Sequence, residues 1–141
     1  MLTTEEVQAF LVKEFPQITV QVEEIEQRRA RVRQPIDSSH LRPGGTVSGP
    51  TMMALADVAA YVAIFTVTGI VPLAVTTNLS INFLNKPAAE RDLVAESELL
   101  KVGSRLVVAD VRIYSAGEPH LLAQASVTYS IPPTVIQSRN D

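Results

Sequence analysis

The sequence has no cysteine, no tryptophan and only two histidines, His40 and His120, among its 141 residues. Without cysteine the chain cannot form a disulfide, use a thiolate nucleophile or bind a metal through sulfur. This composition suits a reducing compartment, and we expect a cytoplasmic protein. The sequence also contains no Walker loop, no GxGxxG pattern and no cluster of histidines and carboxylates. We therefore expect neither a metal ion nor a redox nucleotide as a cofactor.

The chain also lacks an excess of basic residues and an uninterrupted apolar run long enough to cross a membrane. Its 12 Lys and Arg residues against 15 Asp and Glu residues give a net charge of −3, which argues against nucleic-acid binding. The most apolar stretch, residues 58–75, is broken by Gly69 and Pro72 and falls short of the roughly 20 apolar residues that a bilayer requires. We interpret it as a core helix followed by a turn. The first six residues lack the basic and apolar segments of a signal peptide, so we expect no secretion and no membrane partner.

What the sequence does contain is one apolar helix-forming segment with a single charge. From Pro50 to Thr66 most residues are Ala, Val, Ile, Leu, Met, Phe or Tyr, and Asp57 is the only charged one. A carboxylate among apolar side chains must be hydrogen-bonded, paired with a cation or placed at a cavity that water and ligand reach. Asp57 therefore marks either a structural hydrogen bond or an active site.

The residues before this segment have the pattern of a helix start, which is either purely structural or also an anion site. Ser48 is a favourable cap, Gly49 permits close backbone approach, and Pro50 suits the first turn. The free N–H groups there suit an anion or an oxyanion, although every helix has such an end. Asp57 follows Gly49 by eight residues, which places the two about 12 Å apart along one helix. If both act on one reacting carbonyl, they must come from two subunits whose central helices lie antiparallel, so this hypothesis requires a dimer.

The rest of the chain predicts a single α+β domain over residues 1–141. Residues 1–16 carry a capping box, Thr3-x-x-Glu6, followed by apolar residues at helical spacing, and so predict a short first helix. Alternating apolar residues between turn sequences predict two or three strands before the central helix and four, in an antiparallel meander, after it. We expect this curved sheet to wrap the central helix, residues 37–47 to form a loop, and residues 132–141 to form a disordered tail. The expected strands are 18–25, 30–35, 73–85, 92–102, 106–114 and 121–131.

Several polar residues outside the helix are candidates for the site. One of the threonines Thr76 and Thr77 would face Asp57 and help to hold a water, unless this is an edge strand whose polar residues face solvent. His40 lies in a turn-rich stretch and is either catalytic or simply exposed. Cations at turns between strands either contact phosphates or are only solvated; they are Lys86, Lys101 and Arg105.

Residues 24–131 resemble the hot-dog-fold acyl-CoA thioesterases of the phenylacetate-pathway, or PaaI-like, type. The resemblance is carried by Gly49 and Asp57, eight residues apart on the central helix, and by the strand-turn segments 76–87 and 99–107. By this resemblance, the Gly49 N–H would polarise the thioester carbonyl, while Asp57 of the neighbouring subunit would activate water or attack directly. A hydroxyl of Thr76 or Thr77 would position the water.

The resemblance also implies the substrate contacts and the assembly. Lys86, Lys101 and Arg105 would contact the phosphates of coenzyme A, which enters as part of the substrate. Ser48 stands where the family commonly has a histidine and Arg42 where some members have a polar amide, so both would lie against the substrate. Family members pair their helices in a homodimer, often doubled to a homotetramer.

We therefore predict that the chain hydrolyses an acyl- or aroyl-CoA, with the acyl group in an apolar tunnel between subunits. Two alternatives stay open: a non-catalytic acyl-CoA-binding protein of the same fold, and a structural oligomer in which Asp57 only bonds backbone. Hydratases and dehydratases of this fold use a histidine in or near the central helix, and none occurs between His40 and His120. The resemblance therefore disfavours dehydration chemistry.

Overall fold

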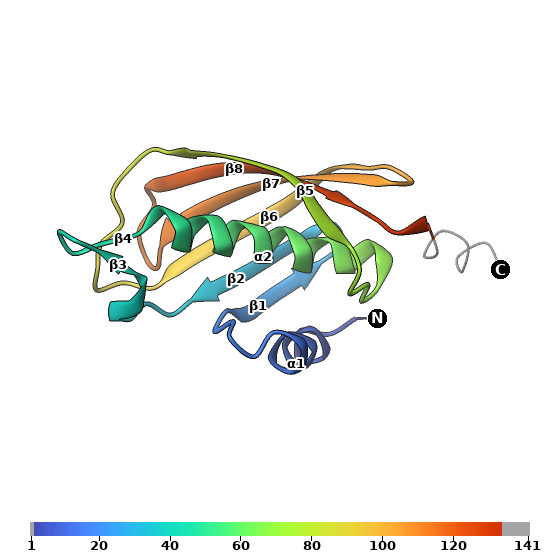
Figure 1. The fold of residues 1–141 in the computed structure, drawn as a ribbon, viewed down its shortest axis with the longest axis horizontal. Coiled ribbons are helices and arrows are strands. Elements are labelled where there is room, and N and C mark those ends of the chain that lie inside the picture. The colour runs from blue at the N-terminus through green and yellow to red at the C-terminus, as the bar shows by residue number, and fades with distance from the viewer. Residues whose placement is uncertain (1, 134–141) are drawn as a thin grey trace.

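One long helix lies across one face of a six-stranded antiparallel sheet (Figure 1). The computed structural model describes residues 2–133. The helices are α1 (Thr4–Glu14) and α2 (Gly49–Thr68), and a 3₁₀ turn, η1 (Ser38–His40), lies between them. The strands are β1 (Gln21–Glu26), β2 (Arg29–Gln34), β3 (Leu41–Arg42), β4 (Thr46–Val47), β5 (Val75–Phe83), β6 (Leu93–Val102), β7 (Leu106–Ser115) and β8 (Leu121–Ser130). The predicted α+β class and the single central helix are confirmed.

The strand order places β5 at one edge of the sheet, next to β8. The order is β1-β2-β6-β7-β8-β5, and each neighbouring pair is antiparallel. Only β6, β7 and β8 follow one another as a meander, so the prediction of a four-strand meander that includes β5 is wrong. The physical reason is the connection over residues 84–92, which contains Pro87 and is too long for a tight hairpin. It carries the chain across the sheet, where β6 pairs with β2 instead.

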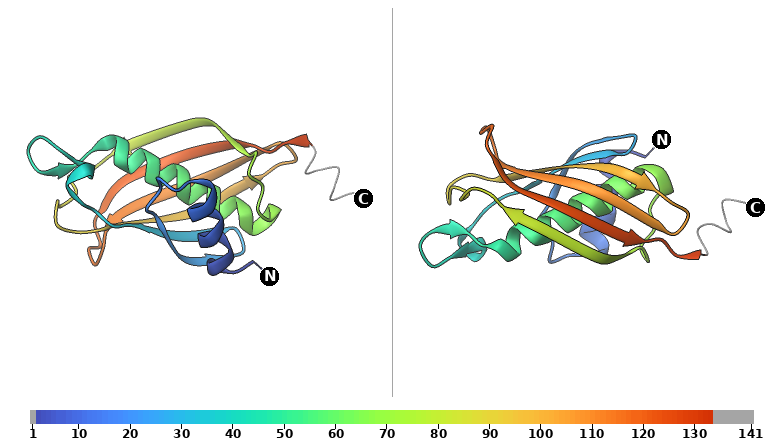
Figure 2. Two further views of the ribbon diagram at one scale, coloured as in Figure 1. Left: turned by 60° about the horizontal axis from the view of Figure 1, so that its bottom comes forward. Right: turned by 90° about the horizontal axis from the view of Figure 1, so that it is seen from above.

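Helix α2 forms the centre of the hydrophobic core. Its residues from Ala59 to Phe65 are all buried, between the sheet that wraps around the helix (Figure 2) and the aromatic side chains Phe10 and Phe15. The helix ends at Gly69, whose positive φ of 76° favours glycine. By length and composition α2 would also suit a membrane, but more than half of it is buried inside the protein. The interpretation of this segment as a core helix therefore agrees with its packing.

Helix α1 lies on the same side of the sheet as α2 and packs against β1 (Figure 2). Its predicted capping box is formed by Thr3 and Glu6. Gln8 also binds the backbone beside it, because its Nε2 donates to the Val20 carbonyl and its Oε1 accepts from the Val22 N–H at 2.6 Å. The Gln8 amide thus provides the backbone of this edge with hydrogen bonds that a neighbouring strand would otherwise supply.

Two regions differ from the expectation or lie beyond the description. The loop expected over residues 37–47 contains η1 and the small sheet of β3 and β4. Strands of two residues are too short to leave a period-two pattern in the sequence. Of the tail expected over residues 132–141, residues 134–141 lie outside the described part of the chain.

Candidate active site

Two hydroxyl groups hold the carboxylate of Asp57 in the middle of α2. Thr76 Oγ1 on β5 donates to Asp57 Oδ1 at 2.6 Å, and the hydroxyl of Tyr129 on β8 donates to the same oxygen at 2.8 Å. The two donors are neighbours because Thr76 and Tyr129 are paired across β5 and β8. No residue between 2 and 133 donates a hydrogen bond to Oδ2. The protein therefore restrains one of the two carboxylate oxygens of Asp57.

The Tyr129 hydroxyl acts as a donor and not as a base. Tyr129 is only 4% exposed. Burial of the phenol, and after it the negative charge of Asp57, raise the pKa of Tyr129 well above its ordinary value near 10. The phenol consequently keeps its proton at any physiological pH.

An apolar cavity of about 290 Å³ opens beside Asp57. Its walls come from α1 and the segment after it, from α2, and from β5 and β8. The lining residues are Leu11, Phe15, Ile18, Asp57, Val58, Tyr61, Pro72, Ala74, Val75, Thr76 and Tyr129. Such a cavity suits an apolar group whose polar end lies at the carboxylate.

The start of α2 carries a second, separate cavity of about 530 Å³. Ser48 caps the helix by accepting a hydrogen bond from the Thr51 N–H, as its sequence position predicts. The N–H of Gly49 has no acceptor among residues 2–133 and points to no intrahelical partner, because it is the first residue of the helix. A Cβ on Gly49 would lie 3.3 Å from the Phe83 ring, so a larger residue there would require this exposed ring to shift.

Within one chain, the structure does not bring Gly49 and Asp57 together. The cavity beside Asp57 and the cavity beside Gly49 share no lining residue. The eight-residue spacing on a continuous α2 keeps the two groups about 12 Å apart. A site that uses both must therefore combine two subunits.

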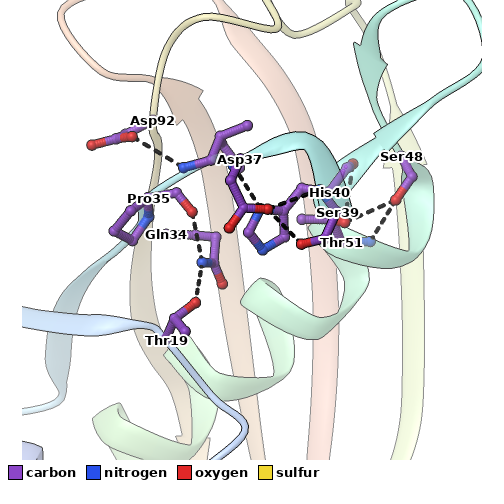
Figure 3. A network of polar contacts seen from close by, with 10 residues as sticks. Thr19, Gln34, Pro35, Asp37, Ser39, His40, Ser48, Thr51 and Asp92 are labelled. Carbon is purple, nitrogen blue, oxygen red and sulfur yellow. Dashed lines mark hydrogen bonds and ion pairs between the residues drawn. The ribbon is translucent and has the colours of Figure 1, made fainter.

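His40 belongs to a polar network that braces the start of α2 (Figure 3). Its Nδ1 accepts a hydrogen bond from the Asp37 N–H at 3.0 Å, and its carbonyl accepts from the Ser48 N–H at 2.8 Å and from Thr51 Oγ1 at 3.4 Å. The ring lines neither of the two cavities described above. The structure thus gives His40 a role in shaping the loop and does not place it at Asp57.

Of the two candidate threonines, only Thr76 reaches Asp57. A β-bulge between Thr76 and Asn78 leaves Thr77 as the extra residue, and its hydroxyl donates to the Thr128 carbonyl at 3.3 Å. Both interpretations of this strand are partly correct. Strand β5 is an edge strand, and the hydroxyl of Thr76 faces the Asp57 carboxylate.

The candidate cations lie at both ends of the sheet. Lys86 and Arg42 line the cavity that contains Gly49. Lys101 and Arg105 lie at the hairpin between β6 and β7, at the opposite end of the sheet (Figure 1), and are exposed. None of these four side chains contacts Asp57 within the described chain.

Tyr129 is the site residue that the sequence did not reveal. In the sequence it is one of several alternating residues of the last strand and fits the core equally well. Its position at Asp57 depends on β8 pairing with β5, and on the register that sets Tyr129 opposite Thr76. A pattern along one strand carries no information about that partner.

A curved antiparallel sheet around a central helix, with a half-buried carboxylate on that helix, is the architecture of the hot-dog thioesterases, as the sequence predicted. The chain belongs to the thioesterase superfamily, whose family model matches residues 44–121. The protein named "Putative esterase SSO1253" from Saccharolobus solfataricus is 32% identical over 133 residues, which cover 93% of this chain and 87% of that protein. Family and fold thus place the chain among thioester hydrolases, while the PaaI-like subtype stays a prediction.

Solved structures with the same fold agree. A crystal structure described as "a putative thioesterase" from Silicibacter sp. TM1040 has a TM-score of 0.87 and 41% identity, and the match covers 94% of both chains. A thioesterase structure with coenzyme A from Streptococcus pneumoniae TIGR4 has a TM-score of 0.71 and 21% identity, over 80% of this chain and 88% of that one. The second similarity is one of fold alone.

Proposed function

We propose that this protein hydrolyses the thioester bond of an acyl- or aroyl-CoA, at a site shared between two subunits. Asp57 serves either as the general base that takes a proton from the attacking water, or as the nucleophile that forms an acyl intermediate. In both routes the carbon–sulfur bond breaks, the acid leaves with an oxygen from water, and the thiolate takes up a proton. The N–H of Gly49 from the other subunit stabilises the oxyanion.

The observation that carries this proposal is the environment of the Asp57 carboxylate. Thr76 and Tyr129 both donate to Oδ1 of Asp57, and no residue between 2 and 133 donates to Oδ2. The free Oδ2 belongs to a side chain that borders an apolar cavity of about 290 Å³. An acyl group in that cavity would bring its carbonyl carbon to the free oxygen, or to a water held by it.

The surface around Asp57 supports the shared site. One stripe of α2, formed by Pro50, Met53, Ala54, Asp57 and Val58, is left uncovered or half-covered by the sheet. We call these five residues the α2 stripe. In an antiparallel pair of such stripes, related by a two-fold axis, the Gly49 end of each helix meets Asp57 of the other. The site then forms twice, once at each end of the pair.

The edge strand beside the stripe is also unpaired on its outer side. Among residues 2–133, strand β5 pairs only with β8, and apolar residues on and next to it are exposed, namely Leu73 (72%), Val75 (56%) and Phe83 (50%). An unpaired edge with exposed apolar side chains is a surface that proteins usually cover. A second copy of the chain would cover it and the α2 stripe together, giving a homodimer that can double to a homotetramer.

The anionic part of coenzyme A would meet the exposed cations. Lys86 and Arg42 flank the cavity that contains the Gly49 N–H, and Lys101 and Arg105 lie near the β5 end that holds Thr76. Such exposed cations suit phosphates as point charges. The Streptococcus pneumoniae structure with coenzyme A, which shares this fold, supports the proposal.

A panel of CoA esters with aliphatic and aromatic acyl groups tests the proposal. Hydrolysis is followed by a thiol-detecting reagent, and binding of coenzyme A is measured by calorimetry. We expect turnover of at least one ester class. Binding without turnover would favour a non-catalytic acyl-CoA-binding protein, and neither binding nor turnover would favour a structural oligomer.

A further inference from the structure

The two donors to Asp57 differ in how firmly the fold holds them. Thr76 lies on the exposed edge strand, where water can compete for its hydroxyl. Tyr129 lies one strand further in and is buried, so its hydrogen bond to Oδ1 is shielded from water. The Tyr129 bond is therefore the more rigid of the two restraints on the carboxylate.

The ring of Tyr129 is itself fixed. It stacks on Tyr61 with ring centroids 5.8 Å apart and an interplanar angle of 28°. Tyr61 is anchored in turn, because its hydroxyl donates to the Pro72 carbonyl at 3.2 Å. The Tyr129 oxygen also lies 3.2 Å from the Asp57 carbonyl, but a phenol has one proton and the shorter contact goes to the charged carboxylate.

A carboxylate bound through one oxygen to two donors on adjacent strands cannot rotate without losing both hydrogen bonds. Its second oxygen then has a defined direction. With Thr76 as the only donor, the Asp57 carboxylate could rotate about that one hydrogen bond. Thr76 is also exposed and lies beside a bulge, so its own position is less restrained. The restraint from Tyr129 removes this freedom, which is the usual way in which a neighbouring group prepares a reacting side chain.

We propose that Tyr129 is a positioning residue for the hydrolysis: it locks Oδ1 of Asp57, so that Oδ2 is the oxygen that meets the water or the thioester carbon. This inference rests on the proposed function. Tyr129 does not touch the substrate's reacting atoms in this scheme. It acts through Asp57, by fixing the orientation of its carboxylate through the hydrogen bond to Oδ1.

The test compares Tyr129→Phe with two other variants of the full chain. Tyr129→Phe keeps the ring and removes only the hydroxyl. Tyr114→Phe makes the same change on the other face of the sheet, at a partly exposed position of β7 remote from Asp57. Asp57→Asn measures whether the carboxylate is needed at all. Circular dichroism and size-exclusion chromatography confirm that each variant keeps its fold and assembly.

We expect Tyr129→Phe to lower kcat by about ten-fold or more, the scale of losing a hydrogen bond to a charged group, with little change in KM. Tyr114→Phe should match the parent in both kcat and KM. A residue that only stabilised the fold would reduce the amount of folded protein and leave kcat per folded chain unchanged.

The outcomes separate the two proposals. If Asp57→Asn is inactive while Tyr129→Phe keeps the parent's kcat and KM, the role of Tyr129 is overturned and the proposed function stands. If Asp57→Asn turns over substrate as fast as the parent, both are overturned. In the Asp57→Asn background, a further Tyr129→Phe change should have no added effect on kcat, because the two residues act as one unit.

Discussion

A charged side chain on an apolar helix needs partners, and Asp57 illustrates how far a sequence can predict them. The lone carboxylate in an apolar segment is visible in the sequence, and burial energetics alone demand hydrogen bonds or a cavity for it. The structure supplies both. Thr76 was one of two candidate partners, whereas Tyr129 was hidden because only the register of β5 on β8 brings it near.

The first prediction at this scale concerns the Asp57 carboxylate. Asp57→Asn keeps the shape of the side chain and its contact with Thr76 and Tyr129, but removes the charge. We expect kcat for a CoA ester to fall by about 100-fold or more, the usual scale for a positioned acid–base group, with fold and size unchanged. Steady-state kinetics measure it, and unchanged turnover would remove Asp57 from the reaction.

The second residue-scale prediction concerns phosphate recognition by Lys86. Lys86→Ala should raise KM for a CoA ester by about five-fold and leave kcat nearly unchanged, because an exposed charge remote from the reacting carbon contributes to binding alone. A short thioester without the nucleotide should be unaffected. Added salt should weaken substrate binding more in the parent than in the variant.

Lys13→Ala provides the control for Lys86→Ala, because Lys13 is an exposed cation on α1 that lines neither cavity of the site. Its removal should leave KM as it is. If Arg105→Ala raises KM and Lys86→Ala does not, the nucleotide of the CoA ester binds along the β6–β7 hairpin and not beside Lys86.

At the scale of elements, predictions succeeded where a periodic pattern was long enough to be distinctive. The apolar segment after Ser48 and the capping box at Thr3 gave both helices, and alternation gave the six long strands. The place of β5 was wrong because the rule that successive strands are neighbours is only a tendency, and the connection over residues 84–92 breaks it. Periodicity fixes what an element is and which face is buried, but not which strand lies beside it.

Helix α1 should influence which acyl groups are accepted, because it and the residue after it form one wall of the cavity beside Asp57. Phe15, at the end of α1, stands edge-to-face against Tyr61, with ring centroids 6.0 Å apart. Phe15→Ala should enlarge the cavity and raise kcat/KM for longer acyl-CoA esters relative to shorter ones by about ten-fold, the effect of a few methylene groups in a pocket. A series of acyl chain lengths measures the ratio.

Phe10→Ala is the matched control for Phe15→Ala. Phe10 packs against the same aromatic residues but does not line the cavity. It should lower stability through lost packing and leave the preference for chain length as in the parent. If both variants change the preference equally, α1 acts through stability and not as a wall of the site.

At the scale of the whole molecule, one chain is an incomplete enzyme under the proposed mechanism. The base and the oxyanion donor lie on the same helix about 12 Å apart, and each borders its own cavity. The α2 stripe and the edge of β5 are the surfaces left without partners in the described chain. Catalysis and assembly should therefore be inseparable, and light scattering should show no active monomer at micromolar concentration.

Mixing two inactive variants tests this directly. Asp57→Asn removes the base, and Gly49→Pro removes the oxyanion N–H at the first helical position. The proline ring requires the exposed Phe83 ring to shift, so circular dichroism and size-exclusion chromatography first confirm that this variant folds and assembles. Each variant alone should be nearly inactive. In a mixed dimer, one site carries both changes and the other site carries neither. With random pairing, half of the dimers are mixed and half of the sites in those dimers are intact. Co-expression should therefore restore about a quarter of the parent activity. If the mixture stays as inactive as its components while mass spectrometry shows mixed dimers, both groups act within one chain or Gly49 is not the donor. Recovery of activity would instead place Asp57 and Gly49 on opposite sides of one subunit interface.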